Sequence, residues 1–376
     1  MLDFNFTSVG RGGIIYCALF YFFMLWRYGK LYLTWDNNHK SSKFNNRCFI
    51  LLFFAFVITS WTNGDWFHYQ SFVKEYSPLE PTGLEDFYNF IIAKTHQNYL
   101  IFRCVVWGLA TFFLYKFFKV SNVNPYMAMM FLFVIFIDYF DYSRSALGVS
   151  CYMLGLSMLV CDDDDKKRRR LLGLILILCS VFFHRSMAVM IFLTPFCLVP
   201  INKKTIFFIV VALFLLFSVT QNLFTSLITD LMDSEDEGIA MRAQLYGNAD
   251  NEALISADST LLGWLVGFWK WSIPYLLFIV VSIFVFKYGS KIDKPAKMIY
   301  RYTFSLIATA TLIYFMKFGH AALFYRIYNM SYVAITLLIC YLYQKNIMPS
   351  RTFRRVLFYS GFYMVFTFLY RCYIGA

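Results

Sequence analysis

The sequence predicts an all-α polytopic integral membrane protein with about twelve transmembrane helices. Of its 376 residues, 60% are hydrophobic and only 15% are charged, whereas soluble domains average about 25% charged residues. Apolar runs recur from one end of the chain to the other, and Lys and Arg gather in short blocks between them. That alternation is typical of membrane helices joined by short loops. We therefore expect a single membrane domain over residues 1–376.

A spanning helix needs about 20 mostly apolar residues. The candidate spans, several of which are short, are residues 13–33, 48–62, 98–116, 125–142, 145–161, 171–184, 186–201, 205–224, 260–286, 299–318, 324–343 and 355–373.

The basic residues predict which loops face the cytoplasm. With both termini outside, most of the 34 Lys and Arg residues fall in inner loops, including the run Lys166–Arg170. Most of the 22 acidic residues then fall outside. Two long outer loops result, at about residues 62–98 and 222–259. Within the first, Leu84–Lys94 predicts a short amphipathic helix along the membrane interface.

Several functions are disfavoured by composition. The net charge of +12 does not indicate nucleic-acid binding, because the basic residues are dispersed between apolar runs rather than gathered on one face. The nine Cys residues show no CxxC or metal-ligand spacing, so we interpret them as small buried hydrophobes. No glycine-rich phosphate loop and no HExxH motif is present. We expect no cofactor and no bound metal.

Ionisable residues inside or beside membrane spans are costly, and each is therefore a candidate for function. Asp65, with His68 and Tyr69, follows the second span in the stretch Asn63–Tyr69. Arg103 lies in the first turns of the third span. Ordinary explanations for these residues are a loop acid near the headgroups and an arginine that extends to the outer surface.

Three further groups lie at outer ends of later spans. Asp138, Asp141 and Arg144 straddle the turn between the fourth and fifth spans, where the charge of Arg144 adds to the positive end of a helix dipole. His184 and Arg185 interrupt a long apolar run. The ordinary alternatives are an internal Asp–Arg pair and a buried, hydrogen-bonded histidine.

Tyr325 and Arg326 begin the eleventh span, where an interface anchor is the ordinary alternative. Together, the arginines and His184 predict a cationic pocket at the outer interface. A guanidinium group binds phosphate oxygens through two parallel hydrogen bonds. The expected ligand is therefore the phosphate or pyrophosphate head of a lipid.

Four short motifs together resemble the EpsG family. They are Asn63-Gly64-Asp65 followed by Tyr69, Tyr142-Ser143-Arg144-Ser145-Ala146, Phe183-His184-Arg185-Ser186-Met187-Ala188, and the late pair Tyr325-Arg326. The resemblance covers most of the chain in order and spacing. The chain departs from it at His96–Tyr99, where family members often carry an acidic residue and a glycine.

The EpsG family belongs with the Wzy-like polymerases of bacterial exopolysaccharide, capsule and O-antigen. The resemblance implies a GT-C-like membrane glycosyltransferase that works at the periplasmic face of the inner membrane without a metal. Its donor would be a glycan on undecaprenyl pyrophosphate, transferred to the sugar of a second lipid-linked repeat unit. The implied partners are this lipid-linked oligosaccharide, the lipid bilayer and a chain-length-regulating membrane protein.

Within that chemistry, Asp65 is the expected base, and Arg144 and Arg326 are expected to bind the pyrophosphate. His184 would stabilise the leaving group or act as the base instead. Asp141 would orient Arg144 or replace Asp65 as the base. Of the remaining candidates, Arg103 and Arg185 would be additional phosphate contacts, and His68, Tyr69 and Tyr325 would contact the substrate.

Other functions stay open at this point. The main rival is a flippase or exporter of the same lipid-linked sugars, and a glycan ligase, an acyltransferase or a non-catalytic assembly partner are further alternatives. Transporters usually place their charges near the middle of the bilayer. Here the charges lie at the outer edge, which favours an enzyme.

Overall fold

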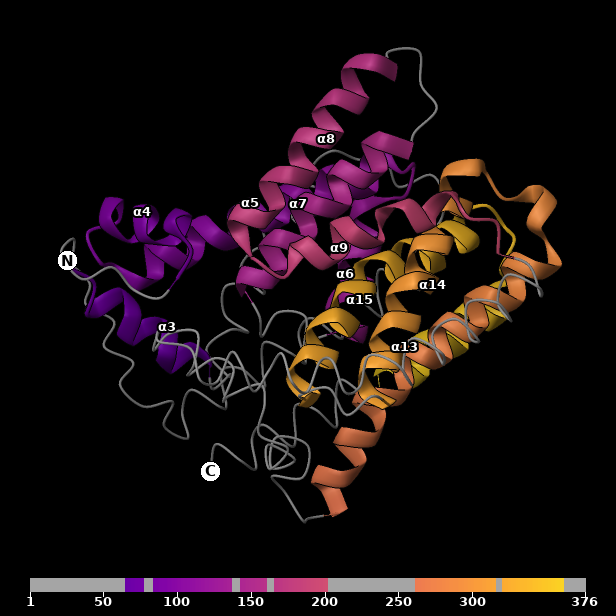
Figure 1. The fold of residues 1–376 in the computed structure, drawn as a ribbon. Coiled ribbons are helices and arrows are strands. Elements are labelled where there is room, and N and C mark those ends of the chain that lie inside the picture. Colours follow the sequence, from indigo (N-terminus) through magenta and orange to yellow (C-terminus); the bar gives the residue numbers. More distant parts are fainter. Residues whose placement is uncertain are drawn as a thin grey trace.

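The computed structural model describes residues 65–77, 84–136, 143–160, 166–201, 261–315 and 320–361, and every regular element within them is a helix (Figure 1). The helices are α3 (Asp65–Lys74), α4 (Asp86–Lys94), α5 (Tyr99–Val120), α6 (Pro125–Ile135), α7 (Ser143–Val160), α8 (Lys166–Phe183), α9 (Met187–Leu193), η3 (Thr194–Leu198), α13 (Leu261–Lys287), η5 (Gly289–Lys291), α14 (Lys294–Phe315) and α15 (His320–Gln344), followed by a helix over 350–361.

Most of the predicted spans in the described part of the chain are helical. Two helical stretches are long and apolar enough to cross a membrane, Tyr99–Val120 and Ile327–Gln344. The amphipathic helix predicted at Leu84–Lys94 is confirmed as α4. The predicted spans 13–33, 48–62 and 205–224 and the predicted outer loop at 222–259 lie outside the described residues.

The predicted span at 186–201 differs from the structure. There the chain forms the seven-residue α9 and then the five-residue 3₁₀ helix η3. At about 1.5–2 Å per residue, this stretch covers well under the roughly 30 Å of a bilayer core. The physical reason lies at Pro195, near the start of η3, because proline lacks the N–H that would continue an α-helix.

Local sequence sets the helix starts. The Asn98 side chain accepts a hydrogen bond from the backbone N–H of Ile101 (3.1 Å), which caps α5. Asn124, the residue before Pro125, caps α6 in the same way. Its side chain accepts hydrogen bonds from the backbone N–H groups of Tyr126 (3.0 Å) and Met127 (3.2 Å). Such caps satisfy backbone donors that have no partner inside the helix.

The bundle is built around α7, which packs against α5, α8 and α15, while α15 packs against α13 and α14. The contact between α7 and α8 is unusually close. A Cβ on Gly155 would lie 2.6 Å from the carbonyl oxygen of Gly173, and a Cβ on Gly173 would lie 2.7 Å from that of Gly155. The two backbones therefore touch, which only glycine permits at this crossing.

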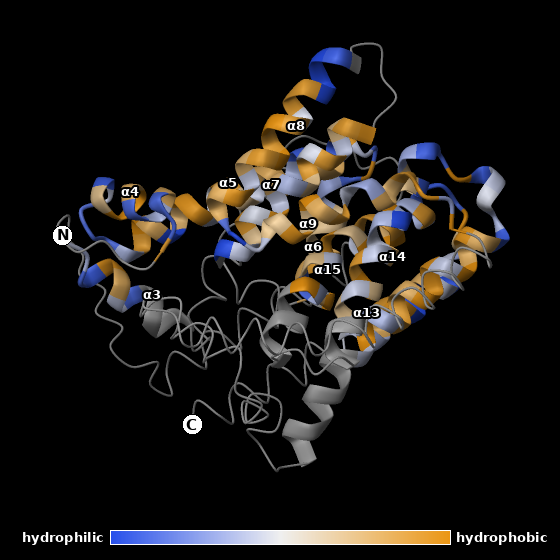
Figure 2. Cartoon of the chain, in the orientation of Figure 1, coloured by the Kyte–Doolittle hydropathy of each residue, from blue (hydrophilic) through white to orange (hydrophobic). Residues whose placement is uncertain are grey.

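One face of α8 is apolar and exposed. The side chains of Leu171, Leu178 and Phe182 are 61–70% exposed, whereas Gly173 and Ile177 on the opposite face are buried against α7. Figure 2 shows α8 as hydrophobic along its length and hydrophilic at its Lys166 end. A continuous exposed apolar face of this kind suits contact with lipid.

Among the described residues, three of the loops predicted to share one side of the membrane lie together, those that follow α5, α13 and α15. At one end, which we call the basic end, the backbone N–H of Asn124 donates to the side chain of Gln344 (3.1 Å). There too, the N–H of Asp293 donates to the hydroxyl of Tyr341 (3.0 Å), and Lys345 pairs with Asp293 (3.5 Å). The other end, which we call the α4 end, gathers α4, the start of α7 and the end of α8.

Candidate functional site

An ion pair lies at the start of α7. Nη1 of Arg144 is 2.9 Å from Oε2 of Glu85, the residue directly before α4. The side chain of Glu85 is 11% exposed and that of Arg144 is 24% exposed. Removing charged groups from water to this degree is costly unless they are paired. Arg144 therefore already has an acidic partner, which sequence reasoning did not assign to it.

Tyr88 joins the start of α7 to the end of α8. Its hydroxyl donates to the carbonyl oxygen of Phe183 (2.9 Å) and lies 3.5 Å from that of Arg144. The side chain is fully buried, and a buried tyrosine hydroxyl normally finds a hydrogen-bond partner. This one residue of α4 holds together the backbones beside two predicted site residues, Arg144 and His184.

His184 lies in the turn between α8 and α9 and is 9% exposed. Its Nδ1 accepts a hydrogen bond from the backbone N–H of Ser186 (3.1 Å), and the Ser186 hydroxyl is 2.5 Å away. Because Nδ1 is the acceptor, the proton of the neutral ring belongs on Nε2. The turn thus fixes the ring and leaves Nε2 as its donor.

His184 packs against the face of α7 that also carries Arg144. A Cβ on Gly148 would lie 3.2 Å from the Cβ of His184, so the histidine packs directly against Gly148. Arg144 precedes Gly148 by four residues, which places it about one helical turn away on the same side. The absence of a side chain at Gly148 is what lets His184 approach α7 so closely.

Arg103 of α5 adjoins the same cluster through aromatic rings. Its side chain is buried (3% exposed), Nη1 donates to the hydroxyl of Tyr99 (3.1 Å), and the guanidinium carbon lies 5.8 Å from the centre of the Tyr99 ring. The ring of Phe102 lies between those of Tyr99 and Tyr88, at 6.4 and 6.1 Å. A chain of aromatic rings therefore connects Arg103 to Tyr88, whose hydroxyl contacts the backbone of Arg144 and that of Phe183, next to His184.

The other predicted site residues are placed less completely. Asp65, His68 and Tyr69 lie on α3, and Tyr325 and Arg326 lie in the first turns of α15; the described structure gives their backbone only. Asp138 and Asp141 lie outside the described residues. Arg185, next to His184, is exposed. The structure thus places Arg144 and His184 beside the same elements, and the joint site stays a prediction.

Glu85 and Tyr88 are the site residues that sequence reasoning missed. Glu85 resembles an ordinary helix N-cap in the sequence, but its side chain makes no capping hydrogen bond. Tyr88 is one of many aromatic residues in the chain, 28 of them Tyr. The signal available for Glu85 was its carboxylate at the start of the predicted amphipathic helix.

Two further features concern other chemistry. Among the residues that the structure describes, no group of three or more His, Cys, Asp or Glu side chains could hold a metal ion.

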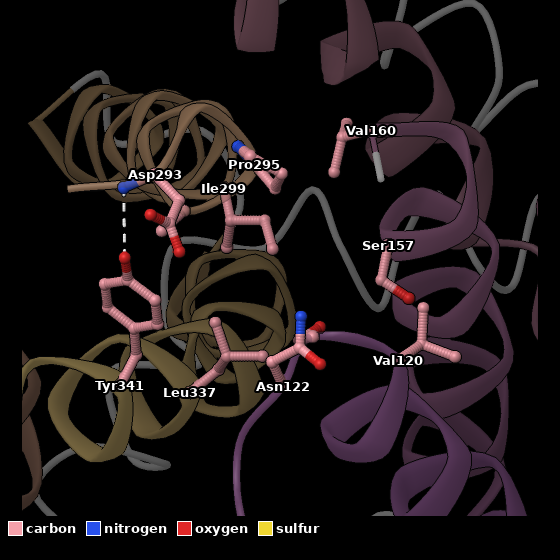
Figure 3. A pocket seen from close by; sticks show the side chains of 11 residues that line it. Val120, Asn122, Ser157, Val160, Asp293, Pro295, Ile299, Leu337 and Tyr341 are labelled. Atoms are coloured by element: carbon pink, nitrogen blue, oxygen red, sulfur yellow. Dashed lines mark hydrogen bonds between the residues drawn. The ribbon is translucent and has the colours of Figure 1, made fainter. Parts of the chain in front are cut away.

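A cavity of about 40 Å³ lies at the basic end and is lined by Asn122, Ser157, Asp293, Leu337 and Tyr341, among others (Figure 3). It has room for about one water molecule and lies away from the Arg144 cluster.

The apolar helices, several with exposed hydrophobic faces, are those of a helical membrane protein. A family model described as the EpsG family matches residues 43–374. The chain therefore belongs to the EpsG family, which includes polysaccharide polymerase-like proteins. No curated protein and no solved structure matches the chain.

Proposed function

We propose that this protein is a polysaccharide repeat-unit polymerase with about twelve transmembrane helices. It transfers a glycan from undecaprenyl pyrophosphate to the sugar of a second lipid-linked repeat unit. The observation that carries the proposal is that Tyr88 joins the start of α7, which carries Arg144, to the end of α8, which precedes His184, in a chain that belongs to the EpsG family.

The reaction breaks one bond and forms one bond at the anomeric carbon. The acceptor hydroxyl attacks this carbon, the bond to the pyrophosphate oxygen breaks, and lipid pyrophosphate leaves with the bonding electrons. Asp65 accepts the hydroxyl proton; Asp141 and His184 are the alternative bases. A general base contributes by being within hydrogen-bond reach of that proton. We expect inversion at the anomeric carbon.

Negative charge builds up on the leaving pyrophosphate. Arg144 and Arg326, with the Nε2–H of His184, stabilise that charge, and Arg103 and Arg185 add to the positive potential. Preorganised donors of this kind contribute on the order of 3–4 kcal/mol each in oxyanion holes. His184 suits the role because Ser186 occupies its Nδ1 and leaves Nε2 as the donor.

The cluster lies at an end of the bundle, opposite the basic end. Basic loops face the cytoplasm in membrane proteins, so the α4 end faces the periplasm, where lipid-linked repeat units become available after they cross the membrane. The lipid tail stays in the bilayer throughout, so the site is open sideways to lipid. A chain-length-regulating membrane protein is an additional partner.

Reconstitution tests this function directly. Purified protein in lipid is given a lipid-pyrophosphate-linked repeat unit without nucleotide sugar, and product length is read on a gel. The parent protein is expected to give a ladder of multiples, which Arg144→Ala, His184→Ala and Arg326→Ala lose while they remain folded. Substrate that instead crosses the bilayer of sealed vesicles, with no ladder, would identify a flippase. A single transfer to an unrelated acceptor would identify a ligase.

A further inference from the structure

Glu85 is held in place from two sides. It directly precedes α4, whose Tyr88 is fully buried and hydrogen-bonded to the end of α8. Its carboxylate reaches Arg144 at 2.9 Å. Asn89, one turn later in α4, donates its side-chain amide to the carbonyl oxygen of Leu84 (3.3 Å) and so fixes the backbone next to Glu85.

The carboxylate does not serve α4 itself. A residue at the N-cap usually accepts a hydrogen bond from a backbone N–H of the first turn, but the side chain of Glu85 makes no such bond. The next residue, Asp86, lies in the first turn, where an acidic side chain favours the helix dipole, and it is exposed. The two neighbouring carboxylates therefore have different environments, and only that of Glu85 is paired with Arg144 in the part of the chain that the structure describes.

A long arginine side chain samples many rotamers, and a bond to a fixed acceptor selects among them. The bond from Nη1 to Glu85 therefore restricts the orientation of the Arg144 guanidinium. In transition-state stabilisation, such orientation decides how well a donor matches the developing charge.

We infer that Glu85 is a positioning residue for Arg144 in glycosyl transfer, an inference that rests on the proposed function. It sets the direction of the guanidinium toward the leaving pyrophosphate, and Tyr88 joins the start of α7 to the end of α8, the two helix ends beside Arg144 and His184. Glu85 itself does not contact the reacting atoms.

The test is a double-mutant cycle in the reconstituted polymerase assay with the lipid-pyrophosphate-linked repeat unit. Glu85→Gln keeps the size of the side chain and removes its charge. We expect kcat to fall on the order of 100-fold with little change in KM, because the interaction acts mainly in the transition state. Asp86→Asn, the matched control one residue away, keeps the parent rate. Glu85→Asp retains the charge and is expected to lie between Glu85→Gln and the parent.

The cycle separates positioning from a merely structural role. In the Arg144→Ala background, Glu85→Gln is expected to change the rate by no more than about twofold, because the group on which Glu85 acts is already gone. An undiminished effect in that background would overturn the inference. So would a rate loss that only tracks the unfolded fraction, measured by thermal unfolding in detergent, or a parent-like rate for folded Glu85→Gln.

If Glu85→Gln does not fold, the kcat of Glu85→Asp decides, and a parent-like value would overturn the inference. A parent protein that makes no ladder at all would refute the proposed function. A parent that makes the ladder with unaffected Glu85 variants would refute the role of Glu85 alone.

Discussion

At the residue scale, the shape of the arginine side chain matters as much as its charge. The Arg144 guanidinium is a planar fork that binds Glu85 on one nitrogen, Nη1. A lysine keeps the charge but offers neither the fork nor its fixed directions. Comparing the rates of lysine and alanine variants at this position therefore separates the effect of the guanidinium's shape from that of its charge.

We expect Arg144→Ala to lower kcat on the order of 10²–10³-fold, as loss of an oxyanion-hole donor does, and Arg144→Lys to recover only a small part of that loss. Initial rates of ladder formation by the reconstituted protein measure both. Arg168→Lys, at the exposed basic start of α8, is the matched control and should keep the parent rate. Full activity in Arg144→Lys would show that a point charge is sufficient.

Asn329 of α15 presents a different case. Its side chain is 5% exposed, and neither Nδ2 nor Oδ1 has a hydrogen-bond partner among the residues that the structure describes. A buried polar group without a partner costs roughly 1–3 kcal/mol.

We therefore expect Asn329→Leu, which is similar in volume and apolar, to raise the thermal unfolding temperature in detergent, by a stabilisation of about 1–3 kcal/mol. Asn329→Asp, which buries a charge, should unfold at a lower temperature than the parent. A lower unfolding temperature for the leucine variant would mean that the amide has a partner in the membrane, such as water or substrate.

At the element scale, the contact between α7 and α8 depends on two glycines. We expect Gly155→Ala to destabilise the protein by about 1–3 kcal/mol, the usual cost of overpacking, because the added Cβ would lie 2.6 Å from the Gly173 carbonyl oxygen. Thermal unfolding in detergent measures this cost. Gly289→Ala, with nothing within 4 Å of the added Cβ, is the control. Equal stabilities for the two variants would contradict the close packing.

The sequence predicted the helices of this protein better than its contacts. Long apolar runs such as that of α5 are readable because a membrane helix must hide its whole backbone within one segment. The stretch at 186–201 was wrong as a full span because hydropathy does not register the helix-ending effect of Pro195. Three of the loops predicted to share the inner side, those after α5, α13 and α15, lie together, and the direction predicted from charge stays a prediction.

The roles of the candidate site residues stay predictions. Arg103, Arg144 and His184 stood out because ionisable groups are rare beside apolar runs, and in the structure Tyr88 contacts the backbone of Arg144 and that of Phe183, next to His184. The acidic partner of Arg144 was not predictable. The nearby Asp138 and Asp141 are close in sequence, whereas Glu85 lies 59 residues away from Arg144, and only the folded chain brings α4 to the start of α7.

At the scale of the whole molecule, the proposed topology makes the two ends chemically distinguishable. In a variant without native cysteines, we expect Asp86→Cys, at the α4 end, to react with a membrane-impermeant maleimide added to intact spheroplasts. Ser290→Cys, exposed in the turn between α13 and α14, should react only after the membrane is opened. The extent of labelling, read by mass shift, would show the opposite pattern if the α4 end faced the cytoplasm.

The touching backbones of α7 and α8 have a consequence for turnover. With no side chains between them at Gly155 and Gly173, the backbones of the two helices are in direct contact, and we expect them to move as one body. Arg144 lies in the first turn of α7, and His184 directly follows α8. We therefore expect these two residues to keep the same positions relative to each other. Under the proposed function, we expect substrates to enter between other helices, so that the geometry of bond transfer stays the same however long the attached polymer has grown.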